Sequence, residues 1–339
     1  MKDKVKKKII KIISNIKDEI TAIKKNIKLI RKKSKKNSVF LLFDMIISYF
    51  KYGVNYEEYR LFGFYNMKRE LKSTYMSKKI HNKLGKYLYD KKHFDLLNNR
   101  EKFYNRLKEY LNHEFYNIKE VSFKRFEEFV LKKKEVIVRS NNLGDEKNTT
   151  ILNVKDFKSP AFLLDKARKS GLIIAEAKIK QNKVFNGINP NSMNTVNIVS
   201  LVSDERVNII SSYVKFGVND KYKYDVDSVK HMTGLIDEKS GQVKGKFLLD
   251  DEFVSEHPIS KVKLSGLEIP FYREMRETVK VLASELDESK EIEWVFVISD
   301  KRIYLTDALV WNDYVTVQAL SKNKEGLLPY YIKSIKRKI

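Results

Sequence analysis

The pattern of apolar residues changes once along the chain, near residue 135. Residues 39–134 contain no proline and place apolar residues at helical spacing, with polar breaks near Asn55 and at 98–99. Beyond residue 135, short β-branched runs are separated by turn signals, and helical stretches intervene at 160–169 and 272–286. The runs cover residues 135–139, 150–154, 172–176, 195–202, 207–218, 293–298 and 302–306. Helices first, followed by a mixed and largely antiparallel region, predict an α+β protein.

The positive charge is concentrated at the N-terminus. Residues 1–37 hold fifteen Lys and Arg against three acidic residues, which is half of the net charge of +24. Apolar residues three and four apart predict an amphipathic helix there, with Val5, Ile9, Ile12, Ile16, Ile20, Ile23, Ile27 and Ile30 on one face. Three interpretations stay open: packing on residues 39–50 or on a partner, contact with an anionic membrane surface, or nucleic-acid binding. Nucleic acid is the weakest of these, because only the charge supports it.

Two absences bound the class of protein. The chain has no cysteine, which excludes disulfides, thiolate metal sites and cysteine nucleophiles. The longest apolar stretch, residues 39–50, is about twelve residues and includes Asp44, whereas a spanning helix needs ~20. We therefore expect a buried helix there, no signal peptide, and a cytoplasmic protein that is soluble or peripheral at the inner face of the membrane.

Four stretches carry a family resemblance through their order and spacing. They are KYGVNYEEYRLFGFYNMKRELKSTYMS (51–77), LIIAEAKIKQNKVFNGINPNSMNTVNIVSLV (172–202), SYVKFGVNDKYKYDVDSVKHMTGLIDEKSGQV (212–243) and HPISKVKLSGLEIPFYREM (257–275). In these stretches the chain resembles the sugar-transfer-associated ATP-grasp family. The resemblance implies an ATP-grasp fold, in which two α+β subdomains with mostly antiparallel sheets clamp ATP. We expect a basic helix at 1–37, a helical region at 38–95, the ATP-grasp domain at 96–320 and a basic tail at 321–339.

The resemblance also implies roles for individual residues, with ATP and Mg²⁺ as cofactors. Arg100 and Arg139 match the two phosphate-facing lysines, Glu176 begins the adenine and ribose linker, and Lys215 replaces an arginine. Lys215 and Asn194 are the implied catalytic residues, and Asp307 with Asn312 the implied metal ligands. Three positions depart from the family pattern: the flap at 140–150 has one glycine, Gly144, Val295 stands where a metal-binding acid is expected, and Leu309 cannot coordinate.

Two functions follow from this resemblance. The first is ATP-dependent ligation of a carboxylate to an amine or a sugar, through an acyl phosphate, during bacterial surface-polysaccharide biosynthesis. The second is a catalytically degenerate scaffold of the same fold that partners glycosyltransferases at the membrane. The retained positive charges at positions 100, 139 and 215 favour the first, whereas Val295 and Leu309 favour the second.

Overall fold

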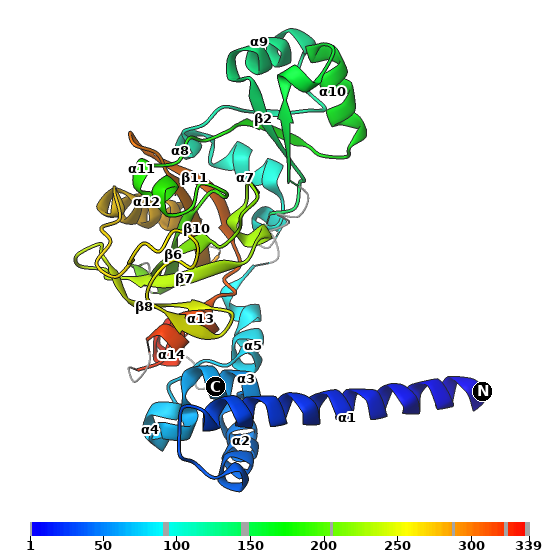
Figure 1. The fold of residues 1–339 in the computed structure, drawn as a ribbon. Helices are drawn as coiled ribbons and strands as arrows, with labels where there is room; N and C mark the ends of the chain where they lie inside the picture. Colours follow the sequence, from blue (N-terminus) through cyan, green and yellow to red (C-terminus); the bar gives the residue numbers. More distant parts are fainter. Residues whose placement is uncertain are drawn as a thin grey trace. The chain divides into compact units, whose positions relative to one another are not determined.

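The chain forms two compact units in a computed structural model (Figure 1). The structure describes residues 2–90, 95–143, 149–203, 206–286, 289–321 and 325–335, without the side chains of residues 2–16 and 228. The helical unit contains Met1–Gly85 and Asp313–Pro329, and the sheet unit contains Lys86–Asn312 and Tyr330–Ile339. None of the described helices is long and apolar enough to cross a membrane.

The helical unit packs around a core of aromatic side chains. Tyr59, Phe62, Phe64 and Tyr75 are each at most 1% exposed, and Ile30 of the first helix joins them. Local signals fix where the helices begin, since Asn55 caps α3 in a reciprocal capping box with Glu58. The helices are α1 (Lys2–Arg31), α2 (Ser38–Tyr52), α3 (Tyr56–Phe62), η1 (Phe64–Asn66), α4 (Arg69–Lys72), α5 (Lys78–Leu88) and α13 (Tyr314–Leu320).

One expectation about this unit is wrong in part. Residues 39–50 do form a helix, α2, but only one side of it is buried. The buried side carries Leu41, Met45, Ser48 and Tyr52, whereas Phe43 and Phe50 are 61% and 79% exposed. The one charged residue of this stretch, Asp44, lies on the inward side, where it accepts from Tyr59 and Lys72. No polar face therefore marks the solvent side, and the sequence predicted burial all round.

The first sheet of the sheet unit has four antiparallel strands in the order β1-β4-β2-β3. The strands are β1 (Phe115–Asn117), β2 (Glu135–Arg139), β3 (Thr149–Asn153) and β4 (Ile174–Ala177). Helices α9 (Phe123–Lys133) and α10 (Pro160–Lys169) cover one face, where Val136 and Val138 point (Figure 1). Successive strand residues alternate between faces, so Ile137 and Arg139 lie on the other face.

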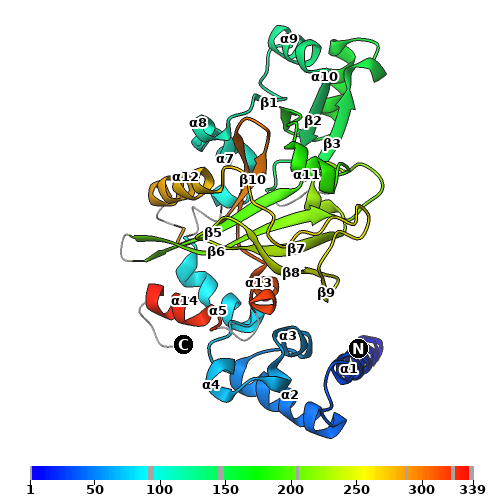
Figure 2. The same cartoon turned by 60° about the vertical axis from the view of Figure 1, so that its left-hand side comes forward.

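The second sheet has seven antiparallel strands in the order β11-β10-β5-β6-β7-β8-β9 (Figure 2). The strands are β5 (Thr195–Ser203), β6 (Arg206–Gly217), β7 (His231–Ile236), β8 (Val243–Leu249), β9 (Glu252–Val254), β10 (Glu291–Ile298) and β11 (Ile303–Leu309). Helix α12 (Tyr272–Glu285) packs on the face that carries Trp294 and Phe296. Shorter elements are α7 (Arg100–Arg106), α8 (Lys108–Leu111), η3 (Val154–Asp156), α11 (Lys183–Ile188) and η4 (Val226–Ser228), and α14 (Leu328–Ile335) follows α13.

The expected α+β class is confirmed, with a helical N-terminal region and mostly antiparallel sheets. Strand β1 is a correction, because it lies in the stretch 39–134 that was expected to be helical. Phe115, Tyr116 and Asn117 pair with β4, some sixty residues away in the chain. A three-residue strand of this kind is set by its distant partner and leaves no periodic signal of its own.

Candidate nucleotide site

Four residues singled out in the sequence meet between the two sheets. Arg139 ends β2 on the face away from α9 and α10, and Glu176 is held on the same face because it pairs with Ile137. Arg100 is the first residue of α7, whose N-cap is the Asn99 side chain. Asp307 comes from β11 of the seven-stranded sheet. Local capping and strand register therefore bring together side chains from positions 100 to 307.

These side chains form a buried ion-pair network with one further acid, Asp225. We call Arg100, Arg139, Glu176, Asp225 and Asp307 the arginine–carboxylate cluster. The Nη1 atom of Arg100 lies 2.6 Å from Oδ1 of Asp307, and Nη2 of Arg139 lies 3.3 Å from Oδ2 of the same carboxylate. The Nη2 atom of Arg139 also lies 3.1 Å from Oδ1 of Asp225, and its Nη1 atom lies 3.5 Å from Oε1 of Glu176. Both arginine side chains are at most 2% exposed.

Two neighbours fix the orientation of Glu176. The hydroxyl of Tyr104 donates a hydrogen bond to Oε2 at 2.6 Å, and Nε2 of His113 lies 3.2 Å from the same oxygen. Burial by itself would raise the pKa of Glu176. Arg139, the hydrogen bond from His113 and the charge of Arg100 outweigh burial and lower that pKa to about 2. Glu176 is therefore ionised throughout the physiological range.

The cluster retains unused hydrogen-bond donors. Among the described residues, neither Nη2 of Arg100 nor Nε of Arg139 has a hydrogen-bond partner, although both atoms are buried. Buried donors of this kind are rare in folded proteins and call for a partner. The nearby acids raise the pKa of both guanidinium groups despite their burial, so both stay charged. Two fixed cations with spare N–H groups are suited to an anion such as phosphate.

An apolar cluster adjoins the two arginines. It consists of Ile137, Ile179, Met193, Tyr224 and Val297, all at most 5% exposed. Ile137 stands two residues before Arg139 on the same strand face, and Val297 comes from β10 of the other sheet. Apolar side chains next to buried cations match a ligand with a flat apolar end and an anionic end.

Lys215 lies on β6, Asn194 lies in the loop just before β5, and the two residues have different surroundings. Lys215 is buried on β6 opposite Thr195, and its ion-pair partner is Asp227 at 2.7 Å. Asn194 is fully buried, and its amide donates to Gln181 and to backbone oxygens while its Oδ1 accepts from the N–H of Gly217. Asn194 thus holds the loop before β5 in place. Catalytic roles for both residues stay predictions.

The expected metal ligands are not arranged as a magnesium site. Both carboxylate oxygens of Asp307 already accept from arginines, and the residue opposite it on β10 is Val295. Asn312 is exposed, and its amide donates to the carbonyl of Val310. The described residues contain no group of three or more His, Cys, Asp or Glu side chains placed to hold a metal ion. Mg²⁺ prefers several free oxygen ligands, so these side chains as placed do not fit it.

An acid does lie near the position where the sequence showed only Val295. Glu293 is on the same face of β10, and its Oε1 accepts from the amide of Asn197 and the hydroxyl of Tyr213, both at 2.6 Å. Its cross-strand neighbour is Leu309, so it does not face Asp307 directly. Those hydrogen bonds hold Glu293 as a structural acid in this arrangement.

Sequence reasoning missed three members of the site's surroundings: Asp225, Tyr104 and His113. Asp225 lies within the stretch 212–243 that carries part of the family resemblance, but no role was expected for it. Tyr104 and His113 carried no motif, because their contact with Glu176 depends on β1 pairing with β4. The glycine-poor flap expected at 140–150 falls partly outside the described residues, since 144–148 are not among them.

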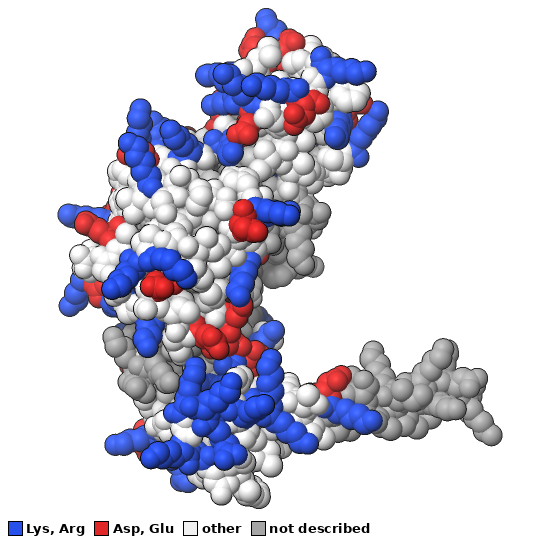
Figure 3. All heavy atoms as spheres, viewed as in Figure 1, with Lys and Arg blue, Asp and Glu red and all other residues white. Residues whose placement is uncertain are grey.

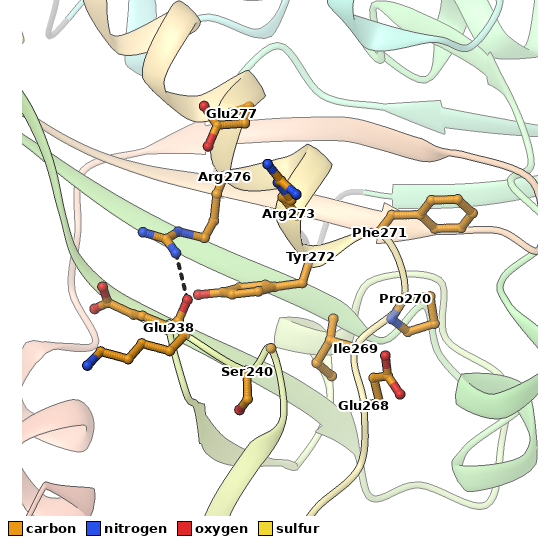
Figure 4. Close-up of a pocket in the computed structure, with 12 residues that line it drawn as sticks. Glu238, Ser240, Glu268, Ile269, Pro270, Phe271, Tyr272, Arg273, Arg276 and Glu277 are labelled. Atoms are coloured by element: carbon orange, nitrogen blue, oxygen red, sulfur yellow. Dashed lines mark hydrogen bonds between the residues drawn. The ribbon is translucent and has the colours of Figure 1, made fainter.

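A separate pocket of about 530 Å³ lies where α12 begins (Figure 4). Its lining includes Arg273, Arg276 and Tyr272 from the helix and Glu238 and Ser240 from the facing turn. Arg276 donates to the backbone carbonyl of Glu238 at 2.6 Å, which ties the helix to that turn. None of the residues expected to bind nucleotide lines this pocket.

Comparisons with known proteins identify one family and several structurally similar proteins. The model of a family described as sugar-transfer associated ATP-grasp matches residues 129–336, more than half of the chain. D-alanyl-alanine synthetase A from Vibrio cholerae is structurally similar, with 9% identity and a TM-score of 0.45 over 71% of this chain and 65% of that one. Carboxyaminoimidazole ribonucleotide synthase from Aspergillus clavatus, complexed with ATP, has 14% identity and a TM-score of 0.43, over 72% of this chain and 55% of that one.

D-alanine–D-alanine ligase from Bacillus anthracis gives 11% identity and a TM-score of 0.39, over 71% of this chain and 68% of that one. The chain spans less than two thirds of the length of the Vibrio cholerae and Aspergillus clavatus proteins. No curated protein matches it by sequence.

Proposed function

This chain belongs to the sugar-transfer-associated ATP-grasp family, and on that premise we propose that it binds ATP at the arginine–carboxylate cluster and uses it to activate a carboxylate. The observation that supports this most directly is the pair of buried arginines with unpartnered N–H groups beside an apolar cluster. In this proposal the phosphates lie against Arg100 and Arg139, and the adenine lies against the apolar cluster.

Binding of a triphosphate requires an exchange of partners. In the structure, Asp307, Asp225 and Glu176 neutralise the two arginines. Phosphate oxygens would take over the unused N–H groups first and then displace the carboxylate that is held least firmly. Asp225 is the best candidate for displacement, since burial raises its pKa and so destabilises its carboxylate relative to the same group in water.

The proposed chemistry has two balanced steps. A carboxylate oxygen of the substrate attacks the γ-phosphorus of ATP, and ADP leaves, which gives an acyl phosphate. An amine or a sugar hydroxyl then attacks the acyl carbon and the bond from that carbon to the phosphate oxygen breaks. The departing phosphate takes up the proton that the nucleophile loses, and an amide or an ester is formed. The protein's own contribution is to position the phosphates and to offset their charge with Arg100, Arg139 and Lys215. When bound, Mg²⁺ would add further charge neutralisation, but the present donors do not assemble its site.

A second function is favoured by one specific contact. The guanidinium of Arg100 binds the carboxylate of Asp307, the position at which the family resemblance implies a metal ligand. A cation built into the protein at that point would suit a scaffold that binds nucleotide without turning it over. Such a scaffold would serve glycosyltransferases of surface-polysaccharide assembly at the inner face of the membrane.

ATP turnover and acyl-phosphate trapping separate the two functions. The full chain is incubated with ATP, Mg²⁺, candidate carboxylates and hydroxylamine, which converts an acyl phosphate into a stable hydroxamate. Hydroxamate and ADP formed in equal amounts would support ligation. ATP binding without ADP release, over a panel of carboxylates, would support the scaffold, and the absence of ATP binding would contradict ligation.

The biological setting is also part of this proposal. We place the substrate among the carboxylate-bearing precursors of bacterial surface polysaccharide, and the reaction at the cytoplasmic side of the membrane. The family's association with sugar transfer supports the polysaccharide setting. Residues 1–37, with half of the net positive charge, are the proposed contact with anionic lipid.

A further inference from the structure

Helix α2 exposes a half-cylinder that is entirely apolar. Its central stripe consists of Val39, Phe43, Ile46 and Phe50, which are 60%, 61%, 45% and 79% exposed. These positions are four, three and four residues apart, so they lie in one line along the helix. The stripe is flanked by exposed apolar and aromatic side chains, namely Phe40, Leu42, Ile47 and Tyr49. The two charged residues of α2, Asp44 and Lys51, fall outside this half.

The opposite half of α2 is already buried. Leu41, Met45 and Tyr52 belong to the aromatic core of the helical unit. Asp44 points toward the same unit, where it accepts from Tyr59 and Lys72. The inward side alone therefore satisfies the packing of α2, and the outer half is a continuous apolar surface of the kind that marks an interaction site.

Positive charge surrounds this apolar half. The sequence between Ile20 and Phe43 has eight Lys and Arg residues and no acidic residue. Four of these cations, Lys24, Lys28, Arg31 and Lys32, line a groove of about 500 Å³ that ends at Ser38, the first residue of α2. Figure 3 shows the dense group of Lys and Arg over this end of the helical unit, next to uncharged surface.

The first helix does not offer a comparable apolar face at this point. Ile23, Ile27 and Ile30 of α1 pack against the core of the helical unit, with Ile30 at 1% exposure. The packing interpretation of the isoleucine stripe therefore applies to this part of α1. Its lysines remain exposed, so α1 contributes charge here while α2 contributes apolar surface.

We propose that α2 lies in the plane of a membrane interface, with its apolar half among the acyl chains and the basic groove around an anionic lipid headgroup. A uniform apolar half bordered by Lys and Arg is the pattern of an interfacial helix that lies on a bilayer without crossing it. A symmetric contact between two copies through α2 fits less well, because it would bring two such groups of cations together. The proposal is independent of ATP chemistry.

Vesicle flotation of the full chain tests this proposal. The probes are phosphatidylcholine vesicles, with and without about 30% phosphatidylglycerol to supply negative surface charge. We expect binding to the anionic vesicles, and the double variant F43S/F50S should weaken it at least ~10-fold because two aromatic anchors are lost. The matched control L131S/F162S removes two apolar residues of similar exposure, 58% and 51%, from α9 and α10 and should leave binding unchanged.

The groove is tested with a second matched pair of variants. K24Q/K28Q should lower affinity for anionic vesicles by about 25-fold, at roughly fivefold for each cation removed. The control K132Q/K246Q removes the same net charge from exposed lysines of the sheet unit and should have little effect. Circular dichroism checks that every variant is folded.

Two results would overturn the proposal. One is vesicle binding that F43S/F50S and its control affect equally. The other is a failure to bind anionic vesicles together with a dimer, seen by sedimentation, that F43S/F50S dissociates. That second result would show that a second copy of the chain covers α2.

Discussion

Replacing Glu176 with glutamine tests the electrostatics of the candidate site most sharply. The ordinary pKa of 4.5 falls to about 2 in the fold, because Arg139, His113 and Arg100 outweigh the effect of burial. At 1.36 kcal/mol for each unit of pKa, the ionised form adds about 3 kcal/mol to the free energy of unfolding at neutral pH. Glu176→Gln keeps the shape of the side chain and removes its charge, so we expect the variant's free energy of unfolding to be lower by about that amount.

The sign of the pH dependence is also fixed. A carboxyl whose pKa is lowered by folding stabilises the fold above its unfolded pKa of 4.5, and this contribution is lost as the pH falls toward 2. The difference between wild type and Glu176→Gln should therefore be constant from pH 7 to 5. Below pH 4.5 this difference in unfolding free energy should decrease, at a rate that approaches about 1.4 kcal/mol for each pH unit.

Urea unfolding followed by tryptophan fluorescence measures this difference. Trp294 and Trp311, the two tryptophans of the chain, are both fully buried in the sheet unit. Glu277→Gln is the control, because it removes an exposed acid that pairs with Lys280 and should change little. A loss at pH 7 no larger than that of the control, or one that stays constant down to pH 3, would refute the reasoning.

Three further outcomes follow from the site. Asp225→Asn should strengthen binding of sulfate at pH 7, measured by thermal shift, because the buried acid no longer competes for Arg139; unchanged binding would argue against partner exchange. Lys215→Met should lower ATP turnover at least ~100-fold if Lys215 offsets charge in the transition state, and unaltered turnover would exclude that role. Asn194→Ala should cost about 3 kcal/mol of unfolding free energy, since it strips partners from several buried polar groups; a loss below ~1 kcal/mol would show that the loop reorganises.

Periodicity in the sequence was enough to place most strands of the sheet unit. The run predicted at 135–139 coincides with β2, and that predicted at 195–202 lies within β5. These strands alternate or are buried on both faces, so their own residues signal them. Strands β1, β7, β8 and β9 lie outside the predicted runs, and the exposed half of α2 was not predicted either, because pairing partners and solvent exposure depend on the rest of the fold.

The candidate site was likewise predictable from the sequence only in part. Arg100, Arg139, Glu176 and Asp307 were singled out one by one through family resemblance, and the fold brings them into contact. Their mutual ion pairs could not be predicted, because they depend on how β2, β4 and β11 approach one another. Asp225 joins them from a loop that has no periodic pattern. Residue types were thus accessible from sequence, whereas the balance of charge between them required three-dimensional geometry.

Calorimetric titration of ATP into the full chain, with Mg²⁺ and then with a chelator, tests the central claim most directly. Because the cations of the site are arginines, we expect ATP to bind in both conditions. Arg139→Ala should weaken binding at least ~100-fold, whereas Arg139→Lys, which keeps the charge, should retain part of it. Failure of ATP to bind, or binding that requires Mg²⁺ and is indifferent to Arg139→Ala, would contradict the account.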